Sequence, residues 1–172
     1  MRAVRLALFA LLLPLVATAQ SPEASPLDKA QTHWFAGRQQ EAVAVLEAAI
    51  RGDANVVRWR FALAWMVQEQ GDLKRAEALL RQLVEDFPDL AEAHNNLAVI
   101  LAGRGELDAA QSALERAVLL QPEHAQAQEN LGDVLLRLAQ RAYAKAAQIT
   151  PPRAALSLKL RRVTDWLLTT PE

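Results

Sequence analysis

Three histidines are the side chains in this sequence that could most readily bind a metal ion or transfer a proton. His33, His94 and His124 are far apart in the chain, and no two lie four residues apart with a carboxylate placed to complete a metal-binding helix. No serine lies in a Gly-x-Ser-x-Gly turn, no cysteine is present, and no glycine-rich loop is suited to hold a phosphate. The sequence therefore predicts no catalytic residue, no metal site and no cofactor, and a protein that is not an enzyme.

The glycines belong instead to an internal repeat, in which four residue types recur every 34 positions. A fixed period in this range is typical of a solenoid of stacked supersecondary units. The four columns are Gly37, Gly71 and Gly105; Ala42, Ala76 and Ala110; Leu46, Leu80 and Leu114; and Pro88 and Pro122.

Each column has a physical reason within a pair of antiparallel helices. Glycine adopts the left-handed backbone conformation that follows a helix end, and the acidic residue after Gly71 or Gly105 suits the start of the next helix. Alanine lets two helices cross closely, the leucines continue an apolar stripe along the second helix, and proline ends that helix. The composition is rich in Ala and Leu, which favours helix over strand, so we expect an all-α chain.

These units resemble tetratricopeptide repeats, whose 34-residue pattern places an aromatic, Leu-Gly, a second aromatic, Ala, an aromatic or Leu, Ala and finally Pro in order. Residues 57–90 and 91–124 match it best, and residues 23–56 match in their second half only. The resemblance implies an all-α fold, a short α-solenoid of helix hairpins with C-terminal capping helices. The matching residues are Leu63, Ala64, Val67, Ala76, Leu80, Leu83 and Pro88 in one unit, and Leu97, Ala98, Leu101, Ala110, Leu114, Ala117 and Pro122 in the next.

The last unit departs from this pattern, because no Gly-Asp turn follows Leu131-Gly132. Apolar residues continue in steps of three and four, so we predict one long helix from Ala125 to Ile149, ended by Pro151-Pro152. A final amphipathic helix follows. We therefore expect a repeat array over residues 27–150, with units near 23–56, 57–90, 91–124 and 125–150, and a capping helix over 151–168.

The first 19 residues have the pattern of a secretory signal peptide. Arg2 and Arg5 precede an apolar run from Leu6 to Val16, and Ala17-Thr18-Ala19 offers small residues for cleavage. The run is shorter than the ~20 residues that cross a bilayer, which disfavours the alternative of an uncleaved anchor. We expect cleavage of residues 1–19, a flexible linker over 20–26, no transmembrane span in the mature chain and a periplasmic location.

The resemblance also implies a concave face lined by the first helix of each unit, where members of the family hold extended peptides or partner helices. Beyond Arg58, the matching positions are neutral to acidic, so an uncharged or basic peptide fits better than a C-terminal carboxylate. The candidate partner-binding residues, carried over by position, are Arg58, Phe61, Trp65, Asn95, Asn96, Val99, Glu129, Asn130 and Asp133.

Two pairs in this set have competing interpretations. Asn96 and Asn130 lie one period apart and could bond a peptide backbone, or each could bond a neighbouring helix of the scaffold. Phe61 and Trp65 are aromatic anchors of the kind found at interfaces, or side chains that the irregular first unit covers.

The sequence thus predicts a non-catalytic periplasmic adaptor that binds a protein or peptide partner. One alternative is a structural module of the cell envelope that self-assembles, as a homodimer whose terminal helices pack on another copy. A second alternative is a regulatory subunit of an envelope enzyme. The net charge of −1 gives no reason to expect nucleic acid as a partner.

Overall fold

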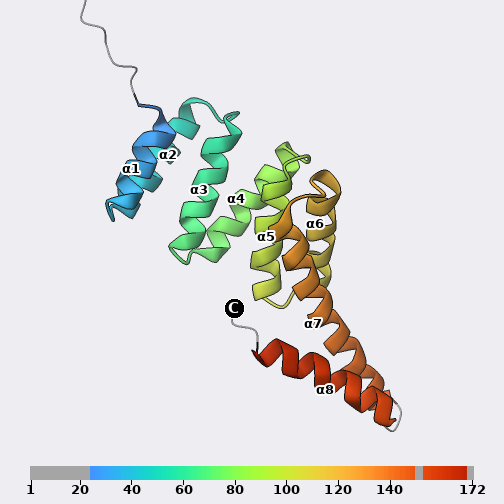
Figure 1. Ribbon diagram of the computed structural model, residues 1–172. Coiled ribbons are helices and arrows are strands. Elements are labelled where there is room, and N and C mark those ends of the chain that lie inside the picture. The colour runs from blue at the N-terminus through green and yellow to red at the C-terminus, as the bar shows by residue number, and fades with distance from the viewer. Residues whose placement is uncertain (1–23, 150–152, 170–172) are drawn as a thin grey trace, which may run out of the picture.

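The computed structural model describes residues 24–149 and 153–169, and all regular structure in these ranges is α-helical. The predicted all-α solenoid of helix hairpins is confirmed (Figure 1), and the predicted signal peptide lies outside the described residues. The helices are α1 (Pro26–Phe35), α2 (Gln39–Gly52), α3 (Val57–Glu69), α4 (Leu73–Asp86), α5 (Ala91–Gly103), α6 (Leu107–Leu120), α7 (Ala125–Ile149) and α8 (Ala154–Thr169).

The first helix begins slightly earlier than the sequence suggested, because Ser25 caps it. The Ser25 hydroxyl accepts a hydrogen bond from the Asp28 backbone N–H (3.2 Å), and the Asp28 carboxylate accepts one from the Ser25 N–H (3.1 Å). This reciprocal capping box satisfies two backbone donors at the helix start. Helix α1 therefore begins at Pro26, within the segment 20–26 that we expected to be a flexible linker.

The repeated glycines form the turns inside the hairpins, as predicted. Gly37, Gly71 and Gly105 have φ angles of 77°, 83° and 80°. In the last of these turns the Gly105 N–H donates to the Ala102 carbonyl (3.0 Å), and the next N–H donates to the Leu101 carbonyl (2.9 Å). The other two turns repeat both bonds, which is the left-handed helix ending that glycine permits at low cost. Each second helix is thereby directed back along the first.

The repeated alanines and leucines form the core of each hairpin. Ala42, Ala76 and Ala110 are fully buried, and the leucines one turn later are also inaccessible to solvent. The alanines allow the close packing of α2 on α1, of α4 on α3 and of α6 on α5. The result is one continuous apolar core that runs the length of the stacked hairpins.

Ion pairs join one hairpin to the next. Glu77 on α4 accepts a hydrogen bond from Arg81 one turn later (2.8 Å) and another from Arg104, which follows α5. Its side chain is 11% exposed, so these two guanidinium groups compensate for the loss of water around the carboxylate. Arg75 on α4 likewise pairs with Glu47 on α2. These contacts fix how neighbouring hairpins are staggered.

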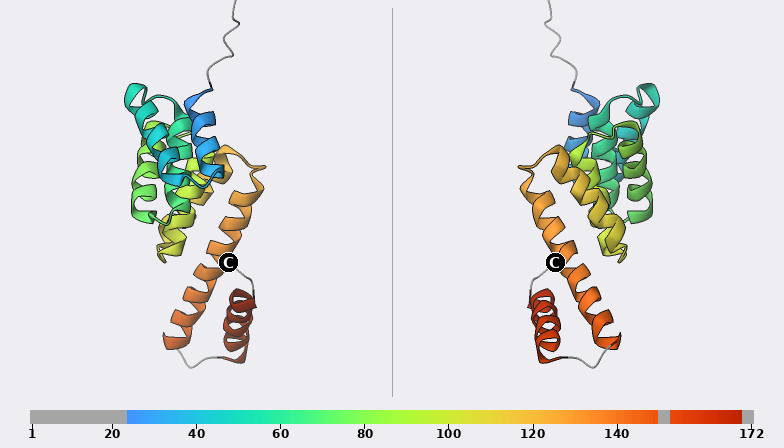
Figure 2. Two further views of the ribbon diagram at one scale, coloured as in Figure 1. Left: turned by 90° about the vertical axis from the view of Figure 1, so that its left-hand side faces the viewer. Right: turned by 90° about the vertical axis from the view of Figure 1, so that its right-hand side faces the viewer.

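The end of the array differs from the rest. Helix α7 is a single helix of 25 residues, which confirms the fusion predicted from the missing turn, whereas α2, α4 and α6 have 14 residues each. Its second half projects beyond the stack, and α8 returns antiparallel to it (Figure 2). Within the described residues, no helix is both long and apolar enough to span a membrane.

The glycine turns lead to a first prediction. Gly105→Ala forces a Cβ into a backbone conformation with φ near +80°, and we expect it to lower the free energy of unfolding by about 1–2 kcal/mol. Gly103→Ala is the matched control, because Gly103 is helical and an added Cβ there meets no atom within 4 Å. It should be neutral or stabilising by less than about 1 kcal/mol. Urea denaturation of both variants measures the difference, and equal effects would contradict the assignment of the turn.

Candidate partner-binding groove

The first helices of the units, α1, α3, α5 and α7, share one face of the array, which we call the first-helix face. The predicted binding residues on it differ in exposure. Arg58, Glu129 and Asp133 are exposed, and Val99 is 42% exposed. Asn95 is buried at 6% exposure, so it lies beneath the surface that a ligand would contact.

A groove on this face separates α5 from α7. It encloses about 380 Å³ and brings together three of the predicted residues, Val99, Asn130 and Asp133. Its floor is apolar, because Ala98 and Leu114 are both fully buried there. Such a mixture of apolar floor and a few polar groups is typical of a site for a peptide side chain.

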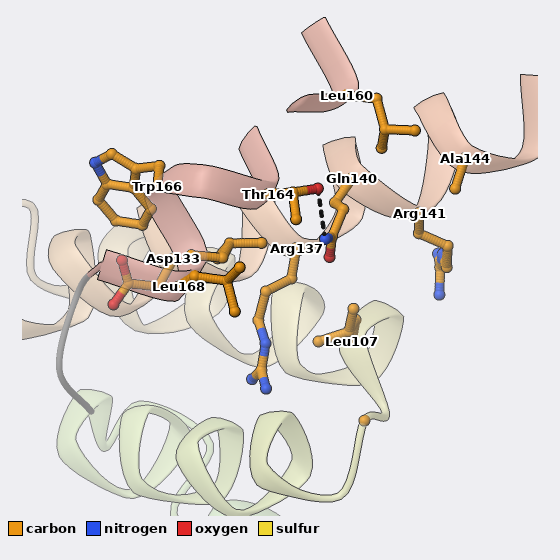
Figure 3. A pocket seen from close by; sticks show the side chains of 12 residues that line it. Leu107, Asp133, Arg137, Gln140, Arg141, Ala144, Leu160, Thr164, Trp166 and Leu168 are labelled. Atoms are coloured by element: carbon orange, nitrogen blue, oxygen red, sulfur yellow. Dashed lines mark hydrogen bonds between the residues drawn. The ribbon is translucent and has the colours of Figure 1, made fainter. Parts of the chain in front are cut away.

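The groove continues into a larger cleft of about 600 Å³ between α7, α8 and the α5–α6 turn (Figure 3). The two hollows share Asp133 and Arg137, so they form one continuous surface along α7. Figure 3 shows the side chains around the cleft and the hydrogen bond from Gln140 Nε2 to Thr164 Oγ1 (3.0 Å), which ties α7 to α8. The wall contributed by α8 is mostly apolar, with Leu160, Trp166, Leu167 and Leu168 beside Thr164.

This α8 wall is the part of the candidate site that sequence reasoning missed. The final helix was expected to cap the array, and its apolar residues were assigned to that packing. In the structure α8 packs on α7 and has no fully buried residue, and Trp166 is 42% exposed beside the cleft. The available signal was the number of apolar side chains around α8, which exceeds what one neighbouring helix can cover.

A network of amides connects α5 to α7 below the groove. Asn130 Nδ2 donates to Asn95 Oδ1 (2.8 Å), and Asn95 Nδ2 donates to Asn96 Oδ1 (3.2 Å). Gln126 Nε2 in turn donates to Asn130 Oδ1 (3.2 Å). Bonding within the scaffold, the second interpretation raised above, therefore accounts for Asn130. No described residue accepts a hydrogen bond from Asn96 Nδ2, so this donor remains available to a ligand.

The aromatic pair on α3 is partly covered by the first unit. The Trp34 ring of α1 lies 5.3 Å from the Trp65 ring, measured between centroids, at an interplanar angle of 53°. Such tilted aromatic contacts are favourable beyond the area they bury. Trp65 nevertheless keeps 36% of its surface exposed, whereas Phe61 is half-buried against the core. Trp65 is thus the member of the pair that a ligand could reach.

The polar groups of the groove leave a negative charge without a partner. Arg137 Nη1 donates a hydrogen bond to the Ala102 carbonyl (3.1 Å) near the C-terminal end of α5. The positive charge of this guanidinium therefore interacts with the negative end of the helix dipole. The Asp133 carboxylate has no hydrogen bond or ion pair with any residue in the described ranges. On α3, Gln68 Oε1 is shielded from solvent and also lacks a donor among the described residues. Asp133 therefore gives the groove a negative charge that is unpaired among the described residues, whereas the shielded Gln68 oxygen is out of reach of a ligand.

The histidines have structural partners. His33 Nδ1 accepts a hydrogen bond from Arg38 (3.0 Å), His94 Nε2 lies 2.9 Å from the Pro88 carbonyl, and His124 Nδ1 accepts from the Ala127 N–H (3.3 Å). Within residues 24–149 and 153–169, no group of three His, Cys, Asp or Glu side chains is placed to hold a metal ion.

Comparison with known proteins shows which family has this architecture. The family model for the tetratricopeptide repeat matches residues 35–100 and, in a second register, residues 67–133. These matches together cover more than half of the chain. The chain belongs to the tetratricopeptide repeat family. Tetratricopeptide repeat proteins are generally non-catalytic scaffolds. No curated protein matches this chain in sequence.

Solved structures share the fold at low identity. MamA is 23% identical with a TM-score of 0.62, over 81% of this chain and 85% of MamA. The first TPR of Spaghetti (RPAP3), bound to the HSP90 peptide SRMEEVD, is 18% identical with a TM-score of 0.62, over 66% of this chain and 90% of that one. YrrB, described as a TPR protein with an unusual peptide-binding site, is 22% identical with a TM-score of 0.55, over 60% of this chain. The match spans about half of YrrB, 54% of its length.

An ion pair beside the cleft leads to a second prediction, about pH. Arg141 binds both oxygens of Asp108 (2.8 and 2.6 Å), and these hydrogen bonds hold the pKa of the Asp108 carboxyl below its ordinary value of 3.8. A lowered pKa means that the pair stabilises the fold above pH 3.8 and that this contribution disappears as the pH falls through the folded-state pKa. Asp108→Asn should therefore lower the melting temperature at pH 7.

The difference between Asp108→Asn and the unsubstituted protein should shrink as the solution is acidified below pH 3.8, measured by circular dichroism at each pH. Arg141→Gln tests the same contact from its other side. The double variant should melt no lower at pH 7 than the less stable single variant, because both changes remove one interaction. A difference that stays constant with pH would show that the ion pair is not its source.

Proposed function

We propose that this tetratricopeptide repeat protein is a non-catalytic scaffold of the bacterial periplasm, which binds a peptide or helix of a partner protein along the first-helix face. The observation that carries the proposal is the continuous groove from α5 over α7 to α8, in which Asp133 lies between two apolar surfaces. Solved TPR structures of the same fold hold peptides, which supports a peptide as the ligand. The absence of a nucleophile or metal cluster among the described residues is compatible with it but does not carry it.

The groove favours a particular kind of segment. Val99 and Trp166 are each 42% exposed on either side of Asp133, so a bulky apolar side chain of the partner can bury itself against them. Asp133 and Glu129 are exposed carboxylates, and Arg137 is engaged at the end of α5. We infer a partner segment with an apolar anchor flanked by basic or uncharged residues. An acidic segment such as the one bound by Spaghetti would meet like charge.

The proposed location follows from the sequence. The charged, apolar and small-residue regions of positions 1–19 have the order of an export signal. The chain has no cysteine, so its stability does not depend on the redox state of the compartment. The apolar core that spans all four units provides that stability instead.

Peptide binding provides the third prediction. Fluorescent nine-residue peptides with a central Leu-Phe pair, flanked by either Lys or Glu, should bind with clearly different affinities, the Lys-flanked peptide more tightly. Asp133→Asn should weaken binding of the Lys-flanked peptide about three- to tenfold, equivalent to about 1 kcal/mol, as measured by fluorescence polarisation. The matched control is Asp165→Asn, because Asp165 is exposed on α8 and does not line the cleft.

Two results would overturn this proposal for the groove. One is equal affinity for both peptides, and the other is an equal effect of Asp133→Asn and Asp165→Asn. Trp65→Ala, read with the same Lys-flanked peptide, tests how far the bound segment extends toward α3. Loss of affinity in a normally folded variant would show that the ligand reaches the exposed part of that ring.

Export is the fourth prediction. When the full chain is expressed in a Gram-negative host, the protein released by osmotic shock should begin near Gln20, as read by N-terminal sequencing. Leu12→Arg places a charge in the apolar run and should leave the chain in the cytoplasm with its first residues attached, whereas Leu12→Ile should be exported normally. An unprocessed chain in the cytoplasm for all three versions would refute a cleaved signal.

A further inference from the structure

The last unit lacks the helix that covers its neighbours. In the units that have a second helix, the residues at the seventh, eighth and eleventh positions of the first helix are buried. On α5 these are Leu97, Ala98 and Leu101, which are 5%, 0% and 2% exposed. The residues at the same positions of α3 are equally buried. Because α7 runs on without a turn, no second helix folds back over it.

The corresponding surface of α7 is therefore open. Leu135, at the eleventh position, is 45% exposed, and Leu131 and Gly132 are half-buried. A Cβ added to Gly132 would meet no atom within 4 Å, although Ala98 at the same position of α5 is fully buried. The exposure of Leu135 and the open space beside Gly132 thus agree that no helix covers this part of α7.

Helix α8 does not fill this surface. It is bound to another side of α7, through the hydrogen bond from Gln140 to Thr164 and through Lys159, whose Nζ lies 5.8 Å from the centre of the Tyr143 ring. At about 100° per residue, Gln140 lies about 140° from Leu135 around the helix, and Tyr143 lies about 80° from Leu135 on the same side as Gln140. The peptide groove and α8 therefore lie on one side of α7, and the vacant surface lies on another.

The vacant surface extends along the part of α7 that projects from the stack. Leu135, Ala142 and Ile149 follow one another at intervals of seven residues and are all exposed, Ile149 to 72%. Figures 1 and 2 show that this half of α7 stands clear of the other hairpins. An apolar residue at every seventh position, with others between, is the pattern by which two helices pair along their whole length.

We propose that a second copy of this chain covers the surface, with the two α7 helices packed antiparallel about a twofold axis between Leu138 and Ala139. This arrangement places Leu135 of one copy opposite Ala142 of its partner, and the same contact is repeated by symmetry. The large side chain of Leu135 thus meets the small one of Ala142 on both sides of the axis, so this part of the surface is complementary to itself.

The length of the stripe also favours a second copy over a foreign helix of the usual repeat type. The second helices of the complete units have 14 residues, and one docked at the seventh to eleventh positions of α7 would leave Ile149 bare. Another α7, with 25 residues, covers the stripe from end to end. The two copies would retain both peptide grooves, because these lie on a different side of α7.

The test is the mass of the purified chain in solution, measured by light scattering and sedimentation up to about 100 μM. We expect a dimer. Leu135→Glu should raise the dissociation constant of the dimer by at least about tenfold. The twofold symmetry repeats the contact, so the substitution buries two carboxylates against apolar side chains. Leu158→Glu on α8 is the matched control, since Leu158 is 47% exposed against 45% for Leu135, and it should leave the dimer intact. Circular dichroism establishes that both variants fold.

Crosslinking tests the geometry, and the lack of native cysteine makes it unambiguous. A mixture of Leu135→Cys and Ala142→Cys chains should form disulfide dimers faster than either variant alone, because only the mixture brings the two positions face to face. A monomer at all concentrations, a dimer that survives Leu135→Glu, or a dimer broken by Leu158→Glu would each overturn the proposal. None of these outcomes affects the peptide-binding experiment, so the two proposals can fail separately.

Discussion

The structure depends on one constraint, which is that a two-helix hairpin has more apolar surface than its own two helices can cover. Glycine with a positive φ folds the second helix onto the first, and the fully buried alanines allow the two to approach closely. The remaining apolar surface has to be buried by the next hairpin. Stacking is therefore required for stability, and ion pairs such as Glu77 with Arg104 set the stagger of the stack.

The same constraint determines where the molecule can bind other molecules. Inside the array each hairpin is covered on both sides by its neighbours, so the outer faces of its two helices stay exposed, and the first-helix face is one of them. At the end of the array, no further hairpin follows to bury the remaining apolar surface. The chain instead continues α7 outward and returns α8 along it, and the cleft of about 600 Å³ arises where these two helices meet the α5–α6 turn. The candidate site is thus a product of how the array ends.

Much of the fold was readable from the sequence, because its determinants are local and repeated. The turns at Gly71 and Gly105, and the single helix from Ala125 to Ile149, follow from residues close together in the chain. The resemblance to tetratricopeptide repeats, carried over by position, also placed Val99 and Asp133 on one face, and both line the groove.

Other features depend on how helices are placed relative to one another, which the period does not contain. The amide contact joins Asn130 to Asn95 and not to Asn96, because neighbouring helices are offset along their axes. Trp34 covers part of Trp65 although the first unit matches the repeat only in its second half. The side of α7 on which α8 packs could not be predicted either, since apolar residues surround both helices.

Helix α7 has a mechanical consequence that follows from its continuity. Its 25 residues form a rod about 38 Å long, whose first half is a wall of the groove and whose second half is free of the stack. A rod without a kink transmits rotation, so a tilt of about 10° moves one end by about 6–7 Å relative to the other. A force applied at Ile149 would therefore act on the end of α7 opposite to the part that lines the groove at Asp133.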